Sequence, residues 1–81
     1  MLKPTILLPK REALARLEGH RDVIEAKLAR FNARLVRVSI EHGDDYYDPD
    51  TGYYTIVLIV RVGNRLRALK PEELELGSLL E

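Results

Sequence analysis

Residues 53–62 read Tyr-Tyr-Thr-Ile-Val-Leu-Ile-Val-Arg-Val, and this stretch is the most informative part of the chain for its fold. It is rich in β-branched and aromatic residues, which are enriched in strands. A strand with one face in water alternates apolar and polar side chains. Residues 56–60 do not alternate. The stretch is therefore predicted to be a central strand that is covered on both faces.

The whole chain is predicted to be a single small domain. Its 81 residues lie near the lower limit of what one hydrophobic core stabilises. No stretch approaches the roughly 20 apolar residues of a membrane span. The chain has no cysteine, and residues 1–4 lack a long apolar signal core, so we expect a cytoplasmic protein without membrane contact. Few Asn, Gln, Cys and Met residues beside 32% charged residues are typical of heat-adapted proteins.

The N-terminal part predicts an arm followed by a long helix. Residues 1–9 hold a short apolar run between two prolines, which suits an extended arm or an edge strand. Residues 10–33 carry apolar side chains at helical spacing. Gly19 allows two interpretations: one bent helix, which we favour because the apolar stripe keeps its phase, or two helices with Asp22 and Glu25 as a capping box. The stripe comprises Leu14, Leu17, Ile24, Leu28 and Phe31, with Leu35 just beyond it.

Residues 34–69 predict a three-stranded antiparallel meander. The first strand alternates, with its apolar side chains at Val36, Val38 and Ile40. A four-residue loop, 49–52, joins it to the central strand, and Gly63-Asn64 predicts a type II′ turn before the third strand. Residues 70–81 predict a short C-terminal helix, because proline followed by glutamates suits a first helical turn.

Together these elements predict an α+β fold, with the long N-terminal helix packed on the meander and a short C-terminal helix. The two turns set the register, so Ile40 is expected to face Arg61, and Val60 to face Arg67. A bulge near Gly43 would shift the first pairing. The helix-facing side of the sheet should then carry Val36, Val38, Ile40, Val57, Ile59, Leu66 and Ala68.

The opposite side of the sheet is then predicted to be an apolar strip edged by arginines, which is typical of an interface. Either the C-terminal tail or a second copy of the chain could cover it. We favour a homodimer, because the tail is short and is interrupted by Gly77-Ser78. The predicted interface residues are Leu58, Val60, Val62 and Leu69.

No pattern in the chain predicts catalysis, a cofactor or a metal. There is no glycine-rich phosphate loop and no nucleophile with a base and an orienting group. The segment from Asp48 to Asp50 begins like a calcium loop, but Tyr53 and Ile59 stand where that loop needs glycine and glutamate. We therefore expect no enzyme, no cofactor and no metal site.

Charge patterning favours a protein partner over nucleic acid. The formal net charge is zero, and basic blocks (1–43 and 58–70) alternate with acidic ones (44–57 and 71–81). Such blocks can pair within the fold or across subunits, whereas nucleic-acid domains usually show a basic excess. We predict a non-enzymatic protein–protein interaction or regulatory protein that acts as a homo-oligomer. The alternative is a nucleic-acid-binding module that would use Arg37, Arg61, Arg65, Arg67, Tyr47 and Tyr54.

Overall fold

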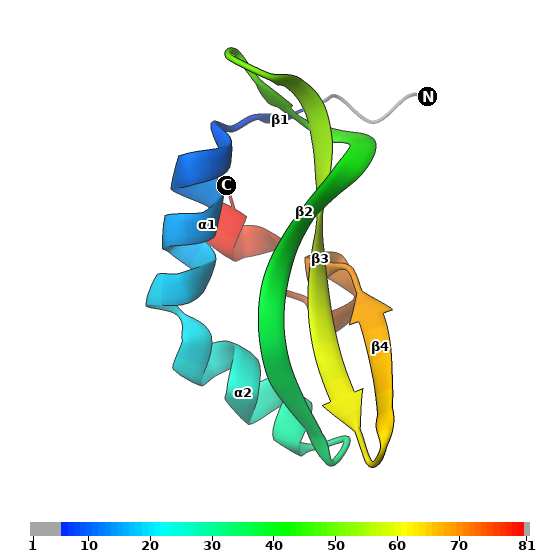
Figure 1. The fold of residues 1–81 in the computed structure, drawn as a ribbon. Helices are drawn as coiled ribbons and strands as arrows, with labels where there is room; N and C mark the ends of the chain where they lie inside the picture. The colour runs from blue at the N-terminus through cyan, green and yellow to red at the C-terminus, as the bar shows by residue number, and fades with distance from the viewer. Residues whose placement is uncertain (1–5, 81) are drawn as a thin grey trace, which may run out of the picture.

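The computed structural model describes residues 6–80 as an α+β domain with two helices on one side of a four-stranded mixed sheet (Figure 1). The sheet order is β1-β2-β3-β4. The strands are β1 (Ile6–Leu7), β2 (Ala33–Asp48), β3 (Gly52–Val62) and β4 (Arg65–Leu69). Strands β2, β3 and β4 pair antiparallel, as expected, but the sheet has one strand more than predicted. The sheet is not purely antiparallel, however, because β1 pairs parallel to β2 as an edge strand. The rest of the predicted arm, residues 1–5, lies outside the described residues.

The helical region forms two helices, and the favoured single helix is wrong. α1 (Lys10–Gly19) and α2 (Arg21–Ala29) are separated by His20, which has φ −118° and ψ 28°. The alternative, a first helix that ends at Gly19, is confirmed. Glycine is a poor interior helix residue, by about 1 kcal/mol relative to alanine, so the helix breaks there at little cost. The capping box that this alternative included does not form, because α2 begins at Arg21 without a side-chain cap.

The C-terminal segment forms two 3₁₀ turns instead of one short helix. These are η1 (Pro71–Leu74) and η2 (Gly77–Leu80). Proline opens η1 as expected, and Glu75 ends it in the left-handed conformation with φ 59°. η2 contacts α1, so the tail closes the core within one chain. The segment buries the side chains of Leu74, Leu76 and Leu80.

The hydrophobic core lies between the two helices and one side of the sheet (Figure 1). The helices contribute four fully buried side chains: Ala13, Leu17, Ile24 and Leu28. The central strand contributes four more, at alternate positions: Tyr54, Ile56, Leu58 and Val60. The predicted stripe therefore faces the core from Leu17 to Leu28, but Phe31 does not. The side of β3 that was predicted to face outward is the core side.

The register between β2 and β3 explains this inversion. The hairpin loop has three residues, 49–51, because Asp48 pairs with Gly52. Ile40 pairs with Ile56 instead of Arg61. Successive strand residues point to opposite faces, so a register change by an odd number of residues moves every side chain of β3 to the other face.

β2 leaves regular pairing at two places, and the longer irregularity lies between Glu41 and Tyr46. It contains Gly43, where the sequence suggested a bulge. A Cβ atom at Gly43 would lie 2.6 Å from the Cβ of Thr55, so only glycine fits without a local shift. The shorter irregularity leaves Val36 40% exposed, although its spacing predicted a core position.

The second hairpin has the predicted register. Val62 pairs with Arg65, and Val60 pairs with Arg67. Gly63 has φ 61°, as the first central position of a type II′ turn requires. This pairing is set by the two turn residues alone, so local sequence was sufficient to predict it.

The four predicted interface residues consequently lie on the helix-facing side. Leu58 and Val60 are fully buried beneath the helices, and Val62 and Leu69 are half-buried on the same face. Their predicted position opposite the helices is wrong, because the register is inverted. A Val60→Lys change, which would place a charge in the core, is expected to unfold the chain instead of dissociating a dimer.

Candidate interaction surface

One side of the sheet faces away from the helices (Figure 1). The register of β2, β3 and β4 determines which side chains lie on this side. Arg37 of β2 pairs with Ile59 of β3, and Ser39 pairs with Val57. On its other side, Ile59 pairs with Ala68 of β4. No helix packs on this side within residues 6–80. We call it the open face; it comprises Arg34, Arg37, Ser39, Glu41, Val57, Ile59, Arg61, Leu66 and Ala68.

The centre of the open face is apolar. Leu66 is 60% exposed, Ala68 is exposed and Ile59 is half-buried. The sequence predicted these residues for the core, so their surface position was missed. Only the register of β2 on β3 could have revealed it. An exposed aliphatic patch bordered by charges is typical of interaction surfaces.

The charges of the open face are ordered along β2. Arg37 and Glu41 lie on either side of Ser39, about 13 Å apart at the rise of a strand. Ser39 Oγ donates a weak hydrogen bond of 3.4 Å to the Glu41 carboxylate. Arg34 lies opposite Arg61. Among the described residues, no carboxylate forms an ion pair with these three arginines.

The residues predicted for nucleic-acid binding are divided between the two sides of the sheet. Three lie on the open side: Arg37, Arg61 and Tyr47. The other three lie on the helix-facing side: Arg65, Arg67 and Tyr54. Tyr54 is 1% exposed, and its hydroxyl donates a hydrogen bond of 2.6 Å to the Leu8 carbonyl. The predicted set therefore does not form one surface.

The four tyrosines form two cross-strand pairs near the hairpin tip. The rings of Tyr46 and Tyr54 lie 5.5 Å apart, and those of Tyr47 and Tyr53 lie 4.9 Å apart in an edge-to-face arrangement. Both distances are typical of stabilising aromatic pairs. The Tyr47–Tyr53 pair is solvent-exposed. A structural role in the long hairpin accounts for both pairs.

Acidic side chains separate the exposed tyrosines from the arginines. The Asp45 carboxylate accepts hydrogen bonds from Thr55 Oγ1 and, at 3.2 Å, from Lys70 Nζ. Hydrogen bonding and attraction to Asp45 raise the pKa of Lys70 above its usual value. Glu41 adds a further negative charge on the same strand. A phosphate backbone that contacted both the tyrosines and the arginines would have to cross this acidic segment.

The Asp48 side chain stabilises the hairpin turn and the start of α1. The Asp48 carboxylate accepts backbone N–H bonds from Lys10 (3.0 Å) and Asp50 (2.8 Å), and these bonds lower its pKa.

Residues 6–80 contain no group of three or more His, Asp or Glu side chains that could hold a metal ion. Within the same range, neither helix has the length and apolar character needed to cross a membrane.

Comparison with known proteins identifies no relative: no family model matches the sequence, no curated protein matches it, and no solved structure matches the fold.

Proposed function

We propose that this chain is a small, non-enzymatic interaction protein that acts as a homodimer through the open face. The supporting observation is the order of charges on that face. Arg37 and Glu41 lie on either side of Ser39 on the same strand, and neither forms an ion pair with another described residue. A surface that carries both signs in this order is complementary to a rotated copy of itself.

The dimer follows from a two-fold axis that lies between the two open faces, parallel to the sheet and across the strands at the Ser39–Val57 pair. The rotation brings each Arg37 to the partner's Glu41. Ile59, Leu66 and Ala68 of the two copies are then buried in the same interface. An interface that uses the same patch on both subunits is the commonest form of oligomer. Apolar burial supplies the affinity, and the charge pairs set the register.

Charge reversal tests this arrangement directly. In sedimentation equilibrium, we expect Arg37→Glu and Glu41→Arg each to weaken association, because each places like charges together. The double variant restores opposite charges and should recover association. Recovery in the double variant identifies the pair, because two independent losses would add instead.

The apolar part of the interface has its own test. Leu66→Lys places a charge on a side chain that is 60% exposed, so the fold should survive while the dimer dissociates. Val23→Lys on α2 is the matched control, since Val23 is also exposed but lies on the helical side of the molecule. A wild-type mass of 9.3 kDa across the micromolar range would refute the homodimer.

Nucleic-acid binding is the second candidate function, and the unpaired Arg34, Arg37 and Arg61 favour it. The acidic segment beside them and the burial of Tyr54 oppose it. A fluorescence titration with single-stranded and duplex nucleic acid at two salt concentrations decides between the candidates. Micromolar binding that weakens with salt would support nucleic acid. We expect no such binding.

A further inference from the structure

A cleft of about 390 Å³ opens between the end of α2 and the helix-facing side of β4. A cavity of this size falls within the usual range of small-molecule sites, about 300–1,000 Å³. Phe31 lines one side, and Arg67 and Glu73 complete the lining. The rest of the lining is apolar: Leu28, Ala33, Val60, Val62, Leu69 and Leu74. The accessible apolar surface of the cleft comes mainly from Phe31, Val62 and Leu69, because the core residues behind them are buried.

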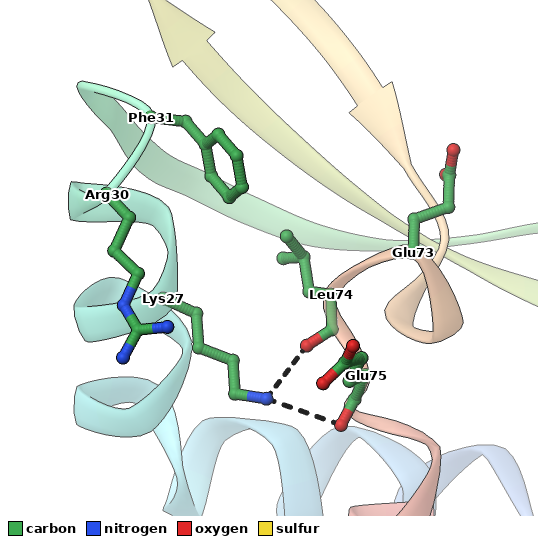
Figure 2. A pocket seen from close by; sticks show the side chains of 6 residues that line it. All are labelled: Lys27, Arg30, Phe31, Glu73, Leu74 and Glu75. Carbon is green, nitrogen blue, oxygen red and sulfur yellow. Dashed lines mark hydrogen bonds between the residues drawn. The ribbon is translucent and has the colours of Figure 1, made fainter.

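Phe31 gives this cleft an exposed aromatic wall. Its side chain is 64% exposed, although the helical stripe predicted a core position. α2 ends at Ala29, and Asn32 then turns the chain with φ 56°, so helical phase is lost at Phe31. Figure 2 shows the Phe31 ring and the Leu74 side chain directed at the same gap. A ligand that fills the gap would remove this aromatic surface from water.

Basic side chains surround the apolar lining. Arg67 lines the cleft, while Lys27 and Arg30 line an adjoining pocket of about 160 Å³ that shares Phe31 (Figure 2). Lys27 Nζ donates hydrogen bonds to the backbone carbonyls of Leu74 (2.9 Å) and the next residue (3.4 Å). No carboxylate among residues 6–80 forms an ion pair with these three basic side chains.

The acidic residues of the region do not neutralise Arg67. The Glu73 carboxylate accepts a hydrogen bond of 2.6 Å from the backbone N–H of Lys70, which caps η1. In Figure 2 the Glu73 side chain points away from Phe31. Glu75 lines only the smaller pocket. The larger cleft thus combines apolar walls with an unpaired guanidinium.

We propose that this cleft binds a medium-chain fatty carboxylate. The hydrocarbon chain lies against Phe31 and Leu74, and the carboxylate accepts paired N–H bonds from the Arg67 guanidinium. Arginine suits this role because its planar fork matches the two oxygens of a carboxylate. The cleft and the open face lie on opposite sides of the sheet, so this site is independent of the proposed dimer.

Nuclear magnetic resonance with the ¹⁵N-labelled full chain tests the site. We expect decanoate, kept below its micelle concentration, to cause saturable shifts at Phe31, Val62 and Leu69 and none at Leu66 on the open face. Decyltrimethylammonium is the matched probe with the same chain length and opposite charge, and it should not saturate the cleft. Absence of saturable shifts, or equal binding of the cation, would overturn the proposal.

Two variants locate the ligand within the cleft. Arg67→Gln should weaken decanoate binding about tenfold or more, as expected for the loss of a charged hydrogen-bonding partner. Arg61→Gln removes an arginine from the opposite side of the sheet and should bind as wild type does. Phe31→Ala should weaken binding while the circular dichroism spectrum stays unchanged, because Phe31 is exposed. Equal affinities for Arg67→Gln and Arg61→Gln would overturn the carboxylate assignment.

Discussion

The carboxylate of Asp48 accepts a hydrogen bond of 3.0 Å from the backbone N–H of Lys10, the first residue of α1. The preceding residue, Pro9, provides no side-chain cap for this helix. Asp48 therefore satisfies an N–H group that the helix itself leaves free, and it places a negative charge at the helix N-terminus. Its other oxygen binds the N–H of Asp50 in the hairpin turn. One side chain thus ties the tip of the long hairpin to the start of α1.

Replacement of Asp48 should destabilise the fold in a pH-dependent way. Asp48→Ala is expected to lower the urea midpoint at pH 7, whereas Asp50→Ala, at an exposed position, should have little effect. The two backbone hydrogen bonds lower the pKa of Asp48 from 3.8, so its stabilisation is fully present above that pH. It is lost as the pH falls through the lower, folded-state pKa. The stabilities of the wild type and Asp48→Ala should therefore begin to converge below pH 3.8 and become equal only below the folded-state pKa of Asp48. Equal midpoints for the two alanine variants at pH 7 would contradict this role.

Tyr54 should be the last of the four tyrosines to ionise. Burial raises its pKa to about 12, with a smaller contribution from repulsion by Asp48. Because the folded-state pKa lies above the ordinary value of 10, the stabilisation is complete below pH 10 and is lost between pH 10 and 12. Ultraviolet titration of phenolate absorbance should show a last step near pH 12 that is lost in Tyr54→Phe, whereas Tyr46, whose pKa is also raised above 10 by burial, should still titrate late in both proteins. At pH 7 Tyr54→Phe should cost about 1–3 kcal/mol, since it leaves the Leu8 carbonyl without its donor. Tyr53→Phe, at the exposed neighbouring position, is the control.

Two glycine-to-alanine changes should have opposite effects. At Gly43 an added Cβ would lie 2.6 Å from Thr55 Cβ, so Gly43→Ala should force the strands apart and lower stability. At Gly19 an added Cβ meets nothing within 4 Å, so Gly19→Ala should raise stability by up to about 1 kcal/mol. Thermal unfolding followed by circular dichroism measures both. A neutral Gly43→Ala would show that the bulge has room for a side chain.

Replacement of Glu75 by glycine should stabilise the fold. Glu75 ends η1 with φ 59°, a conformation that costs an L-residue roughly 1–2 kcal/mol and costs glycine little. Glu75→Gly is expected to raise the free energy of unfolding by about 0.5–1 kcal/mol, since glycine also loses more backbone entropy on folding. The backbone carbonyl that accepts a bond from Lys27 is retained. Glu75→Ala keeps the Cβ atom and should not stabilise the fold. If alanine raised the free energy of unfolding as much as glycine, the Glu75 carboxylate and not the backbone conformation would be the unfavourable feature.

Much of the secondary structure could be predicted because its signals are local. The Gly63-Asn64 turn sets the pairing of Val62 with Arg65, since the turn type alone determines which residues face each other. The alternating residues of β2 and the apolar run of β3 were correctly assigned to strands. Gly19 marked the position of the helix break, but phase continuity of the apolar stripe favoured the wrong alternative. Both helices can share one stripe because they pack on the same side of the sheet.

Local sequence was sufficient to place strands β2 to β4 and the helical region before them, whereas contacts between residues far apart in the chain determine which faces these elements bury. The irregularity between Glu41 and Tyr46 depends on contact between Gly43 and Thr55, which only the paired strands create. The hairpin loop, with three residues instead of the predicted four, shifts the pairing of β3 with β2 by an odd number, and this moves Leu58 from a predicted interface into the core. The cap on α1 comes from a residue 38 positions away. A strand side chain points to one face or the other, so a single odd register shift, invisible in local sequence, reassigns every side chain of the central strand.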